Sequence, residues 1–360
     1  MSKFLAQISA ALVVATAISA ARASANPHDV TLAVTMTNDP TTNAIQVYDA
    51  GTHAWLQTLP TQGKGGAGGN ARGVKQYRGD IVAVVNNGSN TVAVFRRHQD
   101  GLRFEQLIAT TSAPVSIDFG NDHMYVAGAT TVDSFVLHEN RVGGLDGTTS
   151  LELVGGVVPP SGSTAQVGVV DERQLLVTLK TDPTPGTVDV VTLDHGAVSG
   201  AAPTIVSAPT GTLTPFGFAV YPDGTALITL AHSSQDGLFR DGAFTAVIAA
   251  GQSAPCWMTR VGKYAFTANT GSKTISRLIA TGNNVFVDGL VTANIPGGSP
   301  ADIDADRGVL GVIDHGAGQS HLTLFTYNVF GELSPTGAAI TLGVPNANGI
   351  AIVPPAKDND

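Results

Sequence analysis

The chain has 360 residues, a formal net charge of −9, and charged side chains at only 13% of its positions. Nucleic acid and anionic membrane surfaces bind proteins with clustered positive charge, and no run of Lys or Arg occurs here, so neither is expected as a partner. Cys256 is the only cysteine, which excludes an intramolecular disulfide, so packing must stabilise the fold.

The first 25 residues have the organisation of an export signal. Lys3 is followed by an Ala-rich apolar stretch at 4–20, and small residues then alternate with others up to Ala25. Polar residues interrupt the stretch, and a membrane span needs about 20 apolar residues. We expect cleavage after Ala23 or Ala25, which leaves residues 26–360 as one monomeric domain, periplasmic or secreted, without a membrane span.

The rest of the chain repeats one pattern seven times: an apolar β-run, a short polar turn, and a second β-run with a large apolar centre. The paired runs are 31–36 with 44–49, 81–85 with 91–96, 123–127 with 131–137, 174–179 with 187–193, 225–230 with 235–240, 263–268 with 274–279, and 309–313 with 321–327. The pattern returns every ~40–55 residues, and such a period is typical of β-propeller blades with four strands each. The sequence therefore predicts an all-β fold, a seven-bladed β-propeller.

The two ends of the repeat array complement each other. The first copy lacks an innermost strand, and residues 348–353 (NGIAIV) form a spare one near the C-terminus. A C-terminal strand that completes the first blade closes the ring and removes its free edges. An open sandwich or a solenoid, the alternatives for a β-rich chain, does not explain seven units of this length.

Three segments that begin predicted innermost strands resemble a known family. They are 113–117 (APVSI), 214–218 (TPFGF) and 254–257 (APCW). These segments resemble the lactonase-type seven-bladed propellers, the group of 6-phosphogluconolactonase-like, carboxymuconate-cyclase-like and YVTN-repeat proteins. The resemblance extends over essentially the whole mature chain. It implies the fold of that family and, as an expectation, hydrolysis of a small cyclic ester at the top of the central channel.

Active members of the family resemble one another in a His-Pro-His-type segment at the start of an inner strand. The corresponding positions here, among them 70–72 (NAR) and 300–301 (PA), contain no such histidine pair. Two functions therefore stay open. The chain is either an exported lactonase-like hydrolase or a non-catalytic module that binds a small ligand or a protein partner on the same face. A lyase or isomerase on this scaffold is a further alternative.

The predicted site lies on one face of the ring. In a propeller, the loop before each innermost strand and the turn between the second and third strands open on the same face. These positions carry polar residues and one aromatic wall, an arrangement that suits a small ligand. The residues expected to contact the ligand are Trp257, Phe216, Gln166, Lys180, His232, Asn269, Asn86 and Asn348. Asparagine at such turns often only forms hydrogen bonds to backbone groups or adopts a positive φ, so each Asn also has a purely structural interpretation.

The catalytic candidates on this face are His315, Asp314, Arg72 and Asp302. We interpret His315 as a general base that Asp314 or Asp302 orients. Arg72 or Lys180 would then hold a carboxylate or a developing oxyanion.

Three other features of the sequence offer alternatives to this hypothesis. A divalent metal is the one cofactor suggested, with ligands from His232, His315, Asp314, Asp302 and Asp39, but no HxH or HExxH spacing supports it. Cys256 is interpreted as a buried small hydrophobe, because a catalytic thiol needs exposure and a basic partner. Residues 63–69 (GKGGAGG) lack the ending and the following helix of a phosphate-binding loop, and are interpreted as a flexible inter-blade loop.

Overall fold

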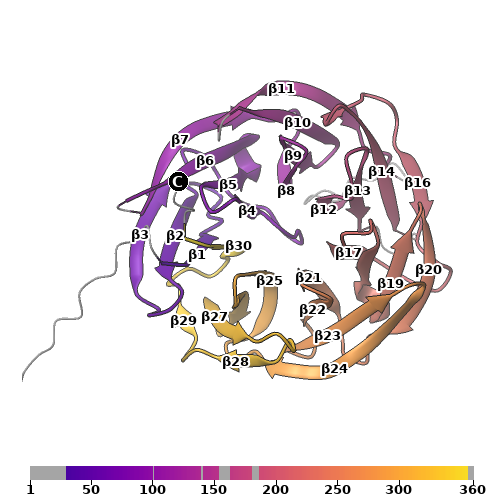
Figure 1. The fold of residues 1–360 in the computed structure, drawn as a ribbon. Coiled ribbons are helices and arrows are strands. Elements are labelled where there is room, and N and C mark those ends of the chain that lie inside the picture. Colours follow the sequence, from indigo (N-terminus) through magenta and orange to yellow (C-terminus); the bar gives the residue numbers. More distant parts are fainter. Residues whose placement is uncertain (1–29, 100, 139–140, 154–162, 181–185, 356–360) are drawn as a thin grey trace, which may run out of the picture.

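The computed structural model describes residues 30–355, except residue 100 and the segments 139–140, 154–162 and 181–185. The expected export signal lies outside the described residues. Seven antiparallel sheets surround a central channel as the blades of a propeller (Figure 1). The seven-bladed β-propeller expected from the sequence is confirmed.

Each blade runs from an innermost strand at the channel to outer strands at the rim. Blade 1 contains β30 (Asn348–Val353), β1 (Leu32–Met36), β2 (Ala44–Asp49) and β3 (Trp55–Pro60). Blade 2 contains β4 (Val74–Tyr77), β5 (Ile81–Asn86), β6 (Thr91–His98) and β7 (Gly101–Ala109), with the 3-10 turn η1 (Asn87–Ser89) between β5 and β6. Blade 3 contains β8 (Pro114–Gly120), β9 (His123–Gly128), β10 (Thr131–His138) and β11 (Arg141–Ser150).

The other four blades have the same order. Blade 4 contains β12 (Thr164–Val169), β13 (Gln174–Leu179) and β14 (Thr187–Asp194), against which the short β15 (Ala197–Val198) and β16 (Thr204–Ser207) both pair. Blade 5 contains β17 (Pro215–Val220), β18 (Ala226–Leu230), the 3-10 turn η2 (Ala231–Ser233), β19 (Gln235–Arg240) and β20 (Ala243–Ala249). Blade 6 contains β21 (Pro255–Val261), β22 (Tyr264–Asn269), β23 (Thr274–Thr281) and β24 (Asn284–Asn294). Blade 7 contains β25 (Ser299–Asp306), β26 (Val309–Gly316) and β27 (Gln319–Tyr327), followed by β28 (Leu333–Pro335) and β29 (Ile340–Thr341).

The C-terminal strand closes the ring as expected. β30 pairs antiparallel with β1, so that Leu32 lies opposite Val353 and Val34 opposite Ala351. The hydroxyl of Thr35 also donates to the carbonyl of Gly349, at 2.7 Å. The pairing removes the free inner edge that blade 1 would otherwise expose.

Burial explains which strands have continuous apolar sequences. All six residues of β5 (IVAVVN) are buried, because neighbouring blades cover both faces of a middle strand. Along β24 at the rim, buried or half-buried residues alternate with exposed ones over its first half. The core thus lies between the blades, and the innermost strands present side chains to the channel.

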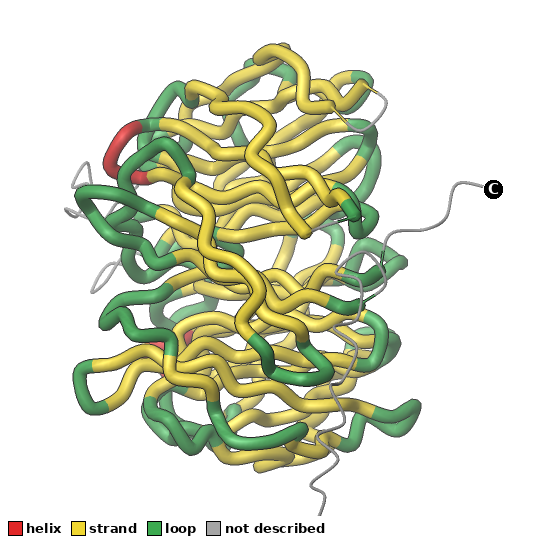
Figure 2. Tube along the Cα trace, turned by 90° about the vertical axis from the view of Figure 1, so that its left-hand side faces the viewer, coloured by secondary structure: helices red, strands yellow, loops and turns green. Residues whose placement is uncertain are grey.

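The loops lie on the two faces of the disc, with the strands between them (Figure 2). We call the upper face the one from which the chain enters every innermost strand. The turns between second and third strands, such as η1 and η2, open on that face as well. Within the described ranges, no helix is long and apolar enough to cross a membrane.

Candidate functional site

A cavity of about 440 Å³ opens on the upper face, between blades 1, 6 and 7 and the loop that joins β3 to β4. Its lining residues are Asn38, Pro40, Gly66–Gly69, Trp257, Thr270, Ser299–Ala301, His315, Asn346 and Asn348. Three of the residues predicted for the site, Trp257, His315 and Asn348, are therefore brought together here. We call this hollow the upper cavity.

The aromatic side of the upper cavity is formed by Trp257. Its indole Nε1–H donates to the carbonyl of Asn70 at 2.9 Å, which fixes the ring. Phe216 packs edge-on against it, with the ring centroids 5.4 Å apart and an interplanar angle of 84°. Trp257 thus lines the cavity, and Phe216 supports it from the neighbouring blade.

The Gly-rich loop at 63–69 is tied across the mouth of the channel. Lys180, at the end of β13 on the other side of the ring, donates to the carbonyl of Gly68 at 3.0 Å and to that of Gly69. The ammonium group also lies 5.9 Å from the centroid of the Phe216 ring. Burial lowers the pKa of Lys180 to about 8. The loop interpreted from sequence as a flexible connection therefore has a defined anchor and lines the cavity.

Two predicted asparagines support turns instead of facing the cavity. Asn86 is fully buried, donates to the carbonyl of Thr61 at 3.2 Å and accepts from the amide of Asn43 at 3.0 Å. Asn269 is also buried and donates to the hydroxyls of Thr274 and Ser276, at 3.1 and 2.8 Å. These contacts are those of asparagines that support turns, and neither side chain lines the upper cavity.

Asn348 both lines the upper cavity and supports the backbone. Its side-chain amide donates to Oδ1 of Asn70 at 2.7 Å, while its own Oδ1 accepts from the backbone N–H of Gly349. Gln166, by contrast, is fully buried between blades 4 and 5, and its amide is occupied by the backbone of Phe218.

His315 lies near the end of β26 and is half-buried in the wall of the upper cavity. Its Nε2 is 2.8 Å from the carbonyl oxygen of Ala347. A carbonyl only accepts, so Nε2 carries the proton and Nδ1 keeps a lone pair. No hydrogen bond to Nδ1 comes from any described residue. The ring is therefore held in the tautomer that can accept a proton at Nδ1.

Asp314 does not orient His315. Neighbouring residues of a strand point to opposite faces, and Asp314 is fully buried on the other side of β26. Its Oδ1 is 3.1 Å from Nδ1 of His321, the residue opposite it on β27, and its Oδ2 accepts from the Thr323 hydroxyl at 3.3 Å. Burial raises the pKa of the Asp314 carboxyl, and the contact with His321 opposes that rise. The Asp314–His315 pair inferred from adjacency is thus replaced by an Asp314–His321 pair.

Asp302 and Arg72 lie together, but away from His315. Oδ2 of Asp302 accepts from the backbone N–H of Arg72 at 3.1 Å, and Oδ1 accepts from its neighbour Ile303 at 2.9 Å. Burial raises the pKa of Asp302 to about 7, and the charge of Asp304 contributes to the rise. Neither Asp302 nor Arg72 lines the upper cavity. The four catalytic candidates therefore do not converge on one ligand.

The remaining candidates are also separate from His315. His232 is exposed on η2 and does not line the upper cavity. Across the described ranges, no group of three or more His, Cys, Asp or Glu residues is placed to hold a metal ion, so the five ligands considered from sequence do not gather. Burial raises the pKa of the Cys256 thiol, which disfavours the nucleophilic thiolate.

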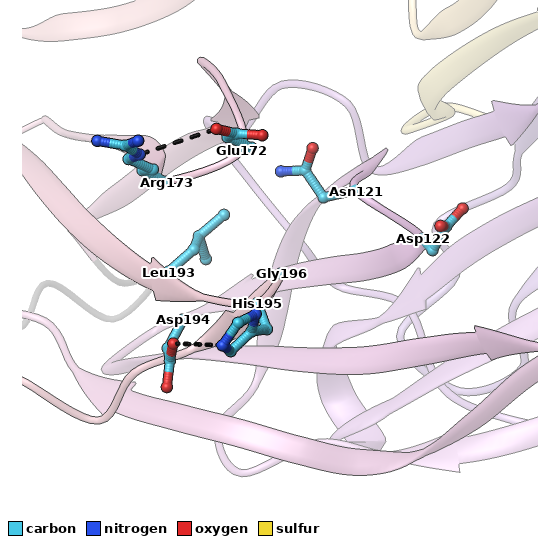
Figure 3. A pocket seen from close by; sticks show the side chains of 8 residues that line it. All are labelled: Asn121, Asp122, Glu172, Arg173, Leu193, Asp194, His195 and Gly196. Carbon is cyan, nitrogen blue, oxygen red and sulfur yellow. Dashed lines mark ion pairs between the residues drawn. The ribbon is translucent and has the colours of Figure 1, made fainter.

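Several further hollows lie on the lower face, and two of them contain carboxylates beside cationic side chains. One, of about 250 Å³, is the lower mouth of the central channel, where Arg72 meets charged residues of other blades. The other, of about 580 Å³, lies at the rim between the turns of blades 3 and 4 (Figure 3). Its ion pairs join sequence neighbours, Arg173 with Glu172 at 3.8 Å and His195 with Asp194 at 3.7 Å. These four side chains are largely exposed, so the rim hollow has no enclosed polar site.

A large part of the upper cavity was not predicted from the sequence. Gly66–Gly69, Pro40, Thr270 and Ser299 line it but carry no side chain that suggests chemistry. The position of the Gly-rich loop in the sequence could have indicated its place: it directly precedes β4, and the loops before innermost strands lie on the upper face.

By sequence, no family profile and no curated protein matches the chain. Solved structures do match its fold. A candidate 6-phosphogluconolactonase from Bacteroides uniformis superposes with a TM-score of 0.65 at 14% identity, over 91% of this chain and 100% of that one. The periplasmic gluconolactonase of Pseudomonas aeruginosa gives a TM-score of 0.64 at 14% identity, over 90% and 98% of the two chains.

A lyase shares the architecture less closely. Virginiamycin B lyase from Staphylococcus aureus, solved with quinupristin, gives a TM-score of 0.54 at 15% identity, over 75% of this chain and 84% of that one. At these identities the likeness shows the fold alone. The chain has the fold of the lactonase-type seven-bladed propellers, in agreement with the resemblance of its innermost-strand segments.

Proposed function

We propose that this protein is an exported hydrolase that opens an uncharged lactone in the upper cavity, with His315 as general base. The observation that carries the proposal is the contact of His315 Nε2 with the carbonyl of Ala347. The hydrogen bond from Nε2 to Ala347 leaves the lone pair on Nδ1, in the wall of a cavity that is large enough for a small ligand.

The composition of the cavity wall supports an uncharged substrate. Apart from His315, none of the side chains that line the upper cavity is titratable. A phosphorylated or carboxylated lactone would be desolvated there without a compensating cation. Trp257 offers an apolar face to a ring, and the asparagines offer hydrogen bonds to hydroxyl groups.

The reaction needs no group beyond water. His315 Nδ1 takes a proton from water while the water oxygen bonds to the lactone carbonyl carbon. The carbonyl oxygen becomes an oxyanion, for which the backbone N–H groups of Gly68 and Gly69 are candidate donors, since no described residue accepts from them. Collapse breaks the ring C–O bond, the imidazolium returns the proton to the leaving oxygen, and a hydroxy acid results.

The test is acid release by the purified full-length protein from uncharged aldonolactones and acyl-homoserine lactones, with a phosphorylated aldonolactone as the charged comparison. His315→Gln keeps a donor for Ala347 but removes the base, so turnover falls by about 10²–10⁴-fold. His195→Gln, at a histidine that is 98% exposed on the lower face, leaves turnover unchanged. Equal turnover by wild type and His315→Gln overturns the proposed mechanism.

A second function, ligand binding without chemistry, is favoured by a different observation. No carboxylate among the described residues forms a hydrogen bond with His315, and Asp314 is paired with His321. A shift of Trp257 fluorescence on adding a lactone, with no acid released over hours, identifies the protein as a binding module.

Export belongs to the same proposal. It is supported by the signal-like composition of residues 1–25 and by the fold shared with a periplasmic gluconolactonase. Mass spectrometry of the protein from the periplasm and the medium tests it. The expected N-terminus is Ser24 or Asn26, and an intact Met1 in both fractions overturns it.

A further inference from the structure

The lower mouth of the channel brings together charged side chains from four blades. Its cavity, of about 250 Å³, is lined by Arg72 and Lys75 of blade 2, Asp118 of blade 3, Thr259 and Arg260 of blade 6, and Asp304 of blade 7. All lie on or directly before innermost strands, which are held on both sides by neighbouring blades. This is a rigid setting for a binding site.

Arg72 and Asp118 neutralise each other. Nη1 of Arg72 is 3.4 Å from Oδ2 of Asp118, and Nη2 donates to the carbonyl of Phe218 at 3.3 Å. Oδ2 of Asp118 also accepts from the backbone N–H of Val169 at 3.0 Å. The charges of these two side chains are therefore balanced within the cavity.

Lys75 is left without a hydrogen bond. Its side chain is only 21% exposed, and its Nζ lies 4.0 Å from Oδ1 of Asp118, which is too long for a hydrogen bond. No hydrogen bond joins the ammonium to any other described residue. The ammonium group therefore has three donors available for a ligand or for water.

The charge balance of the cavity is positive. Three cationic side chains, Arg72, Lys75 and Arg260, line it together with two carboxylates, Asp118 and Asp304, in a protein whose overall formal charge is −9. Arg260 uses Nη1 for the carbonyl of Gly262 at 2.6 Å, which leaves other guanidinium N–H groups available. One negative charge would balance the lining.

Asp304 adds an acceptor. Its Oδ2 accepts from the backbone N–H of Ile352 at 2.9 Å, while no described residue donates to its Oδ1. A ligand that carries a hydrogen-bond donor beside its anionic group would satisfy both Lys75 and Asp304. The volume corresponds to about eight water molecules, which limits the ligand to roughly three to five carbons.

We propose that the lower mouth of the channel binds a small hydroxycarboxylate, with its carboxylate on Lys75 and Arg260 and a hydroxyl on Asp304. The site is separate from the upper cavity and does not depend on the function proposed for it. It explains why Lys75 lies on an innermost strand among carboxylates and yet keeps its donors free.

Calorimetric titration of the full-length protein with glycerate tests the proposal, with glycerol and inorganic phosphate as comparison probes. Glycerate is expected to bind with a dissociation constant below the millimolar range, and glycerol is expected not to bind. Lys75→Met should weaken glycerate binding at least tenfold, whereas Lys75→Arg should restore most of it. Lys273→Met removes the same charge from the opposite face and should leave the affinity unchanged.

Three results overturn the proposal: no glycerate binding, equal affinity in Lys75→Met, or tighter binding of phosphate than of glycerate. Asp304→Asn, which keeps an acceptor for Ile352, gives a second reading should Lys75→Met fail to fold. It is expected to weaken glycerate relative to acetate, which lacks the hydroxyl. His315→Gln should leave glycerate binding intact, so failure of the lactonase proposal and failure of this one are distinguishable.

Discussion

The side-chain amide of Gln166 pairs with the backbone of Phe218 as a neighbouring strand would. Its Nε2 donates to the Phe218 carbonyl at 2.8 Å, and its Oε1 accepts from the Phe218 N–H at 3.0 Å. One side chain thus joins the innermost strands of blades 4 and 5 inside the channel wall. We therefore expect Gln166 to contribute to stability instead of to ligand contact.

Gln166→Ala should lower the free energy of unfolding by about 1–3 kcal/mol, because it leaves the buried N–H of Phe218 without a partner, while the carbonyl of Phe218 keeps its hydrogen bond from Arg72. Urea denaturation measures the loss. Gln57→Ala is the matched control, since Gln57 forms the same two bonds with Leu102 at the outer, more exposed edge of blades 1 and 2. Equal losses in the two variants would contradict the role assigned to burial.

The periodic part of the structure was predictable from sequence. The strands begin and end within a few residues of the predicted runs, and β30 has the predicted bounds 348–353. The reason is physical: a strand buried between blades must be apolar along its whole length, and every blade repeats that requirement.

The site was less predictable, because position in the chain does not fix where a charged group ends up. Arg72 precedes β4 on the upper side, yet its long side chain carries the guanidinium to Asp118 in the lower half of the channel. Adjacency in the sequence suggests His315 as the partner of Asp314, whereas strand register places Asp314 opposite His321. Alternation along β26 would have indicated this partner.

The closing strand depends on a glycine. Gly349 has a φ of +69°, and a Cβ there would lie 2.7 Å from the backbone N of Val74 on the next blade. An L-residue in the left-handed conformation costs about 1–2 kcal/mol by itself. Gly349→Ala should destabilise the protein by more than this amount, because the steric clash adds to it. Gly343→Ala is the control, because Gly343 has a φ of +70° but open space at its Cβ. Thermal unfolding measures both, and equal shifts would contradict the steric argument.

Several buried carboxyls make stability depend on pH, and Asp189 and Asp236 are two of them. Burial raises the pKa of Asp189 to about 6 and that of Asp236 to about 7, and each has an Oδ1 that is buried without a hydrogen bond. The folded protein thus binds these protons more tightly than the unfolded chain, whose carboxyls titrate at about pH 4. The stabilisation that the protonated forms of Asp189 and Asp236 give the fold is complete below about pH 4 and is lost as the pH rises through 6 to 7. The loss is ~1.4 kcal/mol per pH unit for each proton.

Asp236→Asn should flatten this decline, since an amide does not titrate. Urea denaturation between pH 4 and 8 gives the slope for wild type and variant. Asp223→Asn is the comparison: Asp223 is largely exposed and paired with Arg240 at 2.6 Å, and its pKa is lowered. A steeper decline in Asp236→Asn than in wild type would show that the sign is wrong.

The tie between Lys180 and the Gly-rich loop sets the shape of the upper cavity. Lys180→Met keeps the apolar stem over Phe216 but removes the donors to Gly68 and Gly69. The loop should then open more often, and Lys64, which is exposed within it, becomes a better trypsin site. Limited proteolysis with mass spectrometry measures the rate of cleavage after Lys64, which should rise several-fold. Lys263→Met, on the lower face, should leave that rate unchanged, and an unchanged rate in Lys180→Met would mean that the loop is held by its own backbone contacts with Asn38.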